Sequence, residues 1–168
     1  GKGIPAALIM AGFRMSLRAE IRNEFTIRAV MRKVNSLLHE SLERNRFVTA
    51  FYGVLDIRNR VFIYSNGGHN PPLLMHANGS MEYLTEGGMA LGVMGDSVYA
   101  DCPIHLDPGD VMVMFTDGVS ESESPTGEQF GQLRIEQCVA QLADPSSQEI
   151  VDGLGREVVN WTGGRGPN

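Results

Sequence analysis

The sequence feature best suited to chemistry is a carboxylate that directly follows an apolar run. Residues 111–115 are Val-Met-Val-Met-Phe, and Thr116 then leads into Asp117 and Gly118. A buried strand over this run would hold the Asp117 carboxylate rigidly at its end, and Gly118 would let the chain turn at once beside a ligand. Such a carboxylate could bind a hard cation such as Mg²⁺ or Mn²⁺. The alternative is that the Asp-Gly pair only terminates the strand.

A metal centre needs more than one carboxylate. Hydrolysis with two metal ions requires several oxygen ligands that converge from different segments. Three glutamates follow Asp117, but they lie in a serine-rich stretch typical of a solvated loop: Glu121, Glu123 and Glu128. Asp117 is therefore the candidate ligand in this part of the chain.

A second candidate segment is the glycine-rich stretch Asn-Gly-Gly-His-Asn-Pro-Pro over residues 66–72. The paired glycines, of which Gly68 is the second, would allow a close backbone approach, and His69 and Asn70 could contact a substrate or a neighbouring loop. His69 has no partner at metal-ligating spacing, so a structural loop with a hydrogen-bonded histidine is the alternative. The other three histidines are expected to be ordinary surface or strand residues: His39, His76 and His105.

Several common catalytic motifs are missing or incomplete. The opening Gly1-Lys2-Gly3 lacks the earlier glycine and the Ser or Thr of a phosphate-binding loop. The sequence has no Gly-x-Ser-x-Gly motif and no Cys-x-x-Cys pair, so a serine nucleophile or a zinc ribbon has no support. Two cysteines without such a pattern indicate reduced thiols and favour a cytoplasmic protein.

Length and charge narrow the class of protein further. With 168 residues and 42% hydrophobic residues, the chain suits one folded domain. Its net charge of −6 disfavours nucleic-acid binding, which draws its affinity from Lys and Arg. The longest apolar stretch, residues 4–13, is too short to span a bilayer. Because the sequence opens without Met, we expect a fragment of a longer chain.

Apolar periodicity predicts helices at both ends of the chain and strands between them. We expect helices over 4–21, from Ile27 onward, over 130–143, and after Ser146, which forms a capping box with Glu149. Residues 6–13 are apolar on nearly every side, which predicts burial on more than one face of the first helix. The expected strands are 47–57, 61–65, 72–76, 81–84, 98–106 and 111–115.

The turns between these strands predict antiparallel hairpins. Asn78-Gly79 is a strong signal for a tight hairpin because both residues tolerate positive φ. Hairpins argue against a doubly wound parallel sheet, and helices separated from an antiparallel sheet favour an α+β layered fold.

Six short segments together resemble the SpoIIE-type (RsbU-like) branch of the metal-dependent protein phosphatases, the 2C-like serine/threonine phosphatases of bacteria. Each is weak alone, but they occur in order and at family-like spacing over nearly the whole chain. The segments are Gly1–Leu8, Phe47–Phe51, Gly67–Pro72, Leu91–Val93, Leu106–Asp110 and Phe115–Glu121.

The resemblance implies a fold and a chemistry. The fold is a four-layer α-β-β-α sandwich of two antiparallel sheets flanked by helix pairs. Two Mn²⁺ or Mg²⁺ ions would activate a water that attacks phosphoserine or phosphothreonine. Asp117 matches a metal ligand of the family, Gly118 matches its companion, and the first two helices match a pair linked to regulation. Gly68, His69 and Asn70 become possible neighbours of the active site.

The resemblance also implies protein partners, and it implies that some metal ligands lie outside residues 1–168. The usual substrate is an anti-sigma-factor antagonist of the STAS type, and the phosphatase is often fused to a sensor or receiver domain. Other family ligands lie before Gly1 and after Asn168, so residues 1–168 are expected to be a partial phosphatase domain, truncated at both ends and inactive alone. The alternative is a non-catalytic signalling or interaction module with the same fold.

Overall fold

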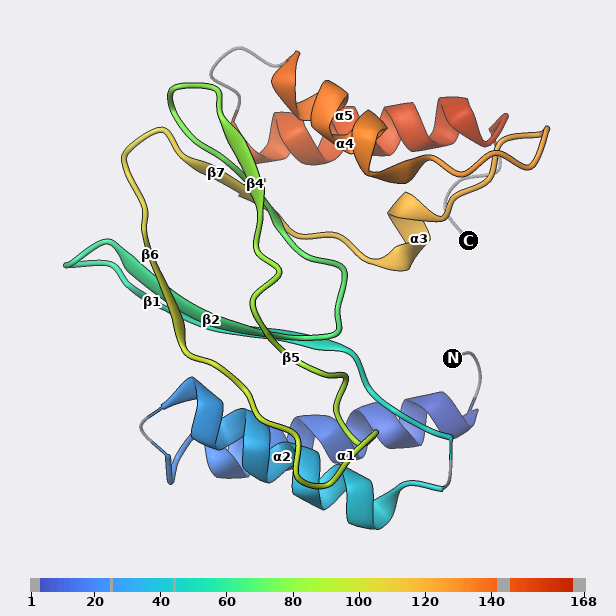
Figure 1. The fold of residues 1–168 in the computed structure, drawn as a ribbon. Coiled ribbons are helices and arrows are strands. Elements are labelled where there is room, and N and C mark those ends of the chain that lie inside the picture. Colours follow the sequence, from blue (N-terminus) through green and yellow to red (C-terminus); the bar gives the residue numbers. More distant parts are fainter. Residues whose placement is uncertain (1–3, 25, 44, 142–145, 165–168) are drawn as a thin grey trace. The chain divides into compact units, whose positions relative to one another are not determined.

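The computed structural model describes residues 4–24, 26–43, 45–141 and 146–164 (Figure 1). The chain forms two compact units. Unit 1 contains residues 1–69 and 85–106, and unit 2 contains residues 70–84 and 107–168. The predicted helix break at Asp144-Pro145 and the opening Gly1-Lys2-Gly3 lie outside the described residues.

Unit 1 is a helix pair packed on one face of a sheet. In the sheet, β2 pairs antiparallel with β1 along its whole length, antiparallel with β6, and in parallel with the two-residue β5. The predicted hairpin is confirmed, whereas the parallel β2–β5 pair departs from the expected purely antiparallel sheets. The elements of this unit are α1 (Ile4–Glu20), α2 (Ile27–Ser41), β1 (Ala50–Asp56), β2 (Val61–Gly67), β5 (Gly87–Gly88) and β6 (Cys102–His105).

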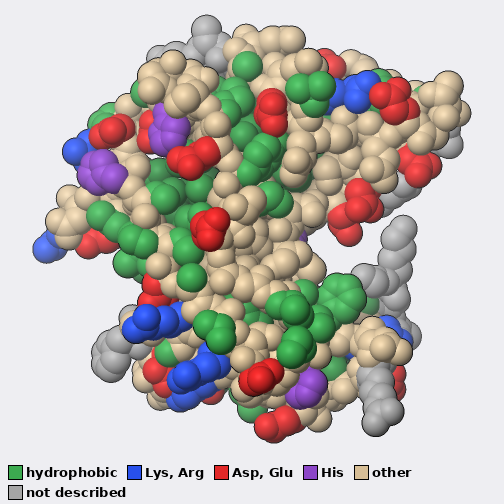
Figure 2. Space-filling model, in the orientation of Figure 1, with side chains coloured by type: hydrophobic (Ala, Val, Ile, Leu, Met, Phe, Trp, Pro, Cys, Tyr) green, Lys and Arg blue, Asp and Glu red, His purple; other side chains and the backbone are tan. Residues whose placement is uncertain are grey.

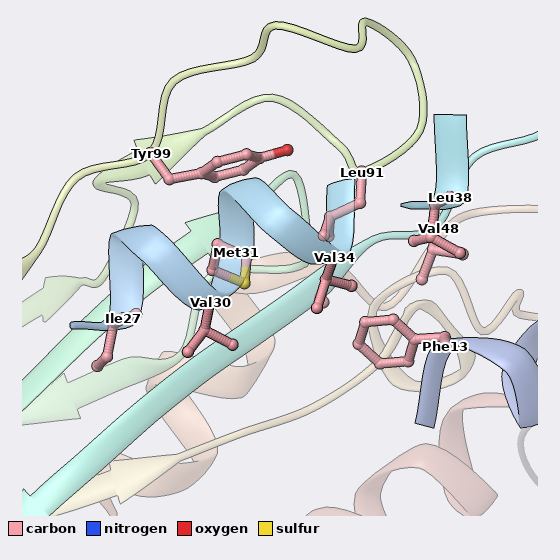
Figure 3. Close-up of a cluster of buried hydrophobic side chains, with 10 residues drawn as sticks. Phe13, Ile27, Val30, Met31, Val34, Leu38, Val48, Leu91 and Tyr99 are labelled. Atoms are coloured by element: carbon pink, nitrogen blue, oxygen red, sulfur yellow. The ribbon is translucent and has the colours of Figure 1, made fainter. Parts of the chain in front are cut away.

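Helix α2 supplies half of the buried core residues of unit 1. It begins after Thr26, whose side chain accepts a hydrogen bond from the Ala29 amide. Its buried stripe follows helical spacing, as predicted, except that Leu37 is exposed. Figure 3 shows how side chains from other segments close around this stripe. The core residues are Phe13, Ile27, Val30, Met31, Val34, Leu38, Val48, Ala50, Leu91 and Tyr99.

Helix α1 is buried on one face only, so the prediction of burial on more than one face was wrong. Phe13 is buried and Leu17 is partly buried against the core. Leu8 and Met10 are 69% and 47% exposed. The reason is geometric: α1 contacts α2 along a single stripe, and an apolar residue outside that stripe stays in solvent.

Unit 2 places a second helix pair on one face of a three-stranded antiparallel sheet. The strand order is β4-β3-β7, and Leu73 faces Val113 across the β3–β7 pair. Both side chains belong to a buried hydrophobic core that also contains Ile135 of α4 and Leu154 of α5. The elements are β3 (Leu73–Met75), β4 (Met81–Tyr83), β7 (Val111–Val113), α3 (Asp117–Ser120), α4 (Gly131–Ala140) and α5 (Ser147–Trp161). The α+β class is therefore confirmed, with one sheet and one long helix pair in each unit.

The capping box predicted before α5 is present. The Ser146 hydroxyl accepts a bond from the Glu149 amide, and the Glu149 carboxylate accepts one from the Ser146 amide at 2.9 Å. Every helix in the described ranges is too short or too polar to cross a membrane.

The Asn78-Gly79 hairpin forms, but with a longer loop than a tight two-residue turn. Gly79 has φ +86°, but Asn78 is not among the described residues with positive φ, so the turn does not have the two positive φ angles of a two-residue loop. The His76 amide donates to the Ser80 carbonyl at 2.8 Å, which leaves three residues in the loop. This is the geometry of a type I turn followed by a left-handed glycine.

His76 links the two loops at one end of the unit 2 sheet. Its Nδ1 lies 3.3 Å from Asp110 Oδ2, and its Nε2 lies 3.0 Å from Glu82 Oε1. Asp110 also accepts a hydrogen bond from the Ala77 amide at 2.9 Å. The hydrogen bond to Glu82 and then the bond and charge of Asp110 raise the pKa of His76, against the opposing effect of burial.

We expect His76→Gln to destabilise the protein in acid but not in base. A raised folded-state pKa stabilises the fold fully below the ordinary histidine pKa of about 6.5, and this stabilisation is lost as pH rises through the raised value. Urea unfolding at about pH 5.5 and about pH 9 measures the difference between wild type and variant. If the variant lost the same unfolding free energy at both pH values, the charge of His76 between Glu82 and Asp110 would not contribute to stability.

Gly68 follows β2 in a conformation that favours glycine. Its φ is +70°, and a Cβ atom there would lie 3.0 Å from both the amide nitrogen and the Cβ of Ala90. Gly79 offers a matched comparison because its φ is also positive but a Cβ would meet nothing within 4 Å.

Gly68→Ala should therefore destabilise more than Gly79→Ala. The left-handed backbone costs each alanine roughly 1–2 kcal/mol, and crowding against Ala90 adds roughly another 1 kcal/mol at position 68 only. Chemical denaturation of both variants gives the two losses in unfolding free energy. Equal losses would show that the contact with Ala90 relaxes without cost.

Candidate functional site

Asp117 lies further from its strand than the sequence predicted. Strand β7 ends at Val113, and Asp117 is instead the first residue of the short helix α3, preceded by Thr116 in an extended conformation. The Asp117 side chain is exposed. Its carbonyl accepts a hydrogen bond from the Glu121 amide at 2.8 Å, which closes the helical turn. Asp117 is thus a solvent-accessible carboxylate on a hydrogen-bonded helical turn.

Gly118 lies within that turn, directly after Asp117. Its carbonyl accepts a 2.6 Å hydrogen bond from the Ser122 hydroxyl, which fixes the chain just after α3. The backbone of Gly118 is helical, so a glycine is not needed here for an unusual backbone angle. Because glycine has no side chain, it leaves open space beside Asp117.

Asn70 lies against the same turn. Its side-chain amide donates to the Ser120 hydroxyl at 3.2 Å, which brings the candidate residue Asn70 to α3 within unit 2. Sequence reasoning missed Ser120. The available signal was its position three residues after Asp117, which places both on adjacent positions of one helical turn.

Gly68 and His69 belong to unit 1, where Asn66 organises their loop. Asn66 is 3% exposed; its Nδ2 donates to the His69 carbonyl at 3.0 Å, and its Oδ1 accepts from the His69 amide at 2.8 Å. His69 Nδ1 lies 3.2 Å from the Thr49 hydroxyl. His69 is therefore held by hydrogen bonds in a structured loop, which is the structural interpretation of this segment. Sequence reasoning missed Asn66 and Thr49 as the residues that hold it.

The glutamates after Asp117 form a solvated loop, as predicted. Glu121, Glu123 and Glu128 are all exposed, and Glu128 accepts a hydrogen bond from Arg134 at 3.0 Å. Residues Glu123 and Gln129 form an isolated antiparallel bridge that closes this loop. Side chains of this loop are therefore hydrated, as expected of a solvated loop.

The described residues do not form a complete metal centre. Within residues 4–24, 26–43, 45–141 and 146–164, His, Cys, Asp and Glu side chains are nowhere grouped in threes that could hold a metal ion. On the face shown in Figure 2, the carboxylates are scattered rather than gathered in one hollow. Two divalent ions need several oxygen ligands, so the donor set present does not fit a two-metal site by itself.

Two curated relatives are similar in sequence. Protein IcfG of Synechocystis is 34% identical over 119 residues, covering 70% of this chain and 18% of its own length. Phosphoserine phosphatase RsbU of Bacillus subtilis is 30% identical over 155 residues, covering 92% of this chain and 46% of its own length. The chain thus spans less than half the length of the relatives that it matches.

Solved structures share the fold. The SiaA-PP2C domain of Pseudomonas aeruginosa matches with a TM-score of 0.84 at 17% identity, over 100% of this chain and 68% of that one. The RsbU and RsbW domains of a Mycobacterium tuberculosis protein match with a TM-score of 0.74 at 26% identity, over 95% of this chain and 44% of that one. RsbX in complex with magnesium matches with a TM-score of 0.65 at 17% identity, over 99% of this chain and 72% of that one.

The α+β units therefore have the architecture of PP2C-type phosphatase domains. The family model described as stage II sporulation protein E matches residues 1–168, which is the whole chain. The order of the six short segments, the fold and this match agree, and the chain belongs to the SpoIIE family.

Proposed function

We propose that this chain is part of a metal-dependent protein phosphatase that hydrolyses phosphoserine or phosphothreonine on a regulatory protein. The observation that carries the proposal is its 30% identity to a phosphoserine phosphatase across 92% of the chain. The exposed carboxylate of Asp117, on the short helix α3 that follows β7 in the chain, supports it chemically.

In this proposal Asp117 is a metal ligand, and the neighbours of its turn position it. Gly118 leaves space beside the carboxylate, and Asn70 holds α3 through Ser120. Gly68 and His69 are proposed as active-site neighbours on the loop organised by Asn66. Oxygen ligands accept Mg²⁺ and Mn²⁺ alike, and the similar fold of RsbX was solved with magnesium.

The missing ligands are proposed to lie in the parent chain outside residues 1–168. This makes the chain a partial phosphatase domain, and two observations support that view. It covers 68% of the SiaA-PP2C domain. In addition, within the part of the chain that the structure describes, β1 and β7 are edge strands that pair with a strand on one side only. An apolar groove of about 620 Å³ runs between β7 and α5. A bare edge beside an apolar groove suits an additional strand.

The proposed substrate is a phosphorylated regulatory protein of the STAS type that antagonises an anti-sigma factor. The support is the similarity to RsbU and to a solved protein that combines an RsbU domain with an RsbW domain. We further propose that a sensor or receiver domain in the same parent chain controls the phosphatase, and that the protein acts in the cytoplasm.

A non-catalytic interaction module with the same fold is the second candidate. The specific observation in its favour is that the described residues lack a metal-binding group of three or more side chains. The parent sequence distinguishes the two functions. Acidic residues close to both ends of this segment favour catalysis, and their replacement by residues that cannot bind metal favours the interaction module.

Residues 1–168 should be inactive on their own. One exposed aspartate cannot hold two divalent ions, so we expect no phosphate release from a phosphoserine peptide with Mn²⁺ present. The parent protein, assayed in parallel, should release phosphate. Turnover by residues 1–168 would overturn the assignment of missing ligands, whereas inactivity of both proteins would favour the interaction module.

Asp117→Asn in the parent protein should lower phosphatase activity by about two orders of magnitude while the fold stays intact. Loss of one ligand charge weakens metal binding, but substitution of an exposed side chain changes the free energy of unfolding by only about 0.5 kcal/mol. Activity is measured as a function of Mn²⁺ concentration. The matched control is Glu123→Gln, which removes an exposed carboxylate from the same segment. Equal effects of the two substitutions would remove Asp117 from the metal site.

A further inference from the structure

Residues 91–99 form a strap that lies across α2 in unit 1 (Figures 1 and 3). At its start, Leu91 and Val48 exchange two backbone hydrogen bonds of 2.8 and 2.9 Å. At its end, Tyr99 is buried in the same core as α2. Apart from the isolated Val48–Leu91 bridge, the strap has no regular secondary structure, so other groups must satisfy its backbone.

Asn35 of α2 supplies hydrogen bonds to the strap with all of its side-chain donors and acceptors. Its Nδ2 donates to the carbonyls of Met94 at 2.8 Å and Gly95 at 3.1 Å. Its Oδ1 accepts from the Gly92 amide at 2.8 Å and from the Tyr99 hydroxyl at 3.2 Å. An asparagine amide has two donors and two acceptor positions, and all four are used on the strap.

Two neighbouring side chains of α2 extend this grip. The Ser36 hydroxyl lies 3.4 Å from the Gly95 carbonyl, and His39 Nδ1 lies 3.0 Å from the Gly92 carbonyl. Asn35 differs from both because it is 0% exposed. Water can replace a bond made by a half-buried or exposed side chain, but it cannot reach the Asn35 amide while the strap is in place.

The start of the strap also packs against the loop that carries His69. A Cβ atom on Gly68 would lie 3.0 Å from Ala90, which directly precedes the strap. A Cβ atom on Gly67 would lie 3.0 Å from the Leu91 side chain. Movement of the strap therefore changes the surface on which residues 66–69 rest.

A polar side chain at position 35 needs an explanation beyond stability. Its neighbours on the buried face of α2 are apolar, among them Met31, Val34 and Leu38. A buried amide contributes little net free energy because its desolvation offsets its hydrogen bonds. Four simultaneous bonds to one segment do, however, specify a single position of that segment on the helix.

We propose that Asn35 is a latch that fixes the strap on α2 and, through the strap, positions the loop of residues 66–69. The latch has two states: all four bonds made, with the strap docked, or all four released together. The assignment of residues 66–69 to the active site rests on the proposed function, whereas the latch itself does not.

Amide hydrogen exchange of residues 1–168 tests the latch. Asn35→Leu keeps the volume of the side chain but removes all four bonds. We expect exchange at the Gly92 and His69 amides to become at least about tenfold faster, while the Leu84 amide of unit 2, which donates to the Pro72 carbonyl, changes little. Asn23→Leu, at an exposed asparagine with one bond to the Ala19 carbonyl, is the matched control and should leave all three amides unchanged.

Tyr99→Phe is a milder variant in case Asn35→Leu does not fold. It removes one bond to the Asn35 Oδ1 and keeps the ring in the core, so exchange at Gly92 and His69 should become about two- to fivefold faster. Faster exchange at Gly92 with an unchanged His69 amide would overturn the coupling. Equal acceleration of all amides, Leu84 included, would show that Asn35 contributes only to global stability.

A phosphatase assay of the parent protein separates the latch from the proposed function. If the loop of residues 66–69 belongs to the active site, Asn35→Leu lowers kcat in the parent and Asn23→Leu does not. A parent protein without turnover would refute the proposed function and leave the exchange result valid. An active parent with unchanged kcat in Asn35→Leu would refute the positioning role of the latch.

Discussion

The structure of unit 1 depends on one constraint: irregular backbone next to a core must have its hydrogen-bonding groups satisfied. Two buried asparagine amides meet that constraint. Asn35 serves the strap of residues 91–99, and Asn66 serves the turn that contains His69. Both sit among glycines, whose missing side chains let separate backbone segments approach closely. These side-chain hydrogen bonds replace the backbone pairing that the two irregular segments lack.

An amide suits these positions better than the other polar side chains. Aspartate has no donor when ionised, and its charge would carry a large desolvation cost at a site that is 0% exposed. Serine has one donor and too short a side chain to reach two carbonyls and two donors at once. Asparagine is neutral and has both donors and acceptors in one plane. The residue type therefore follows from the number of backbone groups to be paired.

Much of the fold could be predicted from the sequence because it depends on local patterns. The helical spacing of α2, the hairpin of β1 and β2 and the capping box of Ser146 are set by nearby residues. The exposure of Leu8 could not be predicted, because periodicity shows which side chains are apolar but not how many neighbours a helix has. The loop at Gly79 also differs in length, since Asn-Gly fits more than one hairpin geometry.

The sequence identified candidate site residues, but it could not predict which of them contact one another. The pairing of Asn70 with Ser120 and the role of Asn66 depend on contacts that no sequence pattern specifies. Asp117 illustrates the limit in physical terms. An exposed carboxylate is well hydrated, so it has no reason to bind a divalent ion unless further oxygen ligands share the cost of removing that water. The chemistry of Asp117 is therefore a property of the complete ligand set, and the hydrogen-bonded turn of α3 supplies only the position from which one ligand can act.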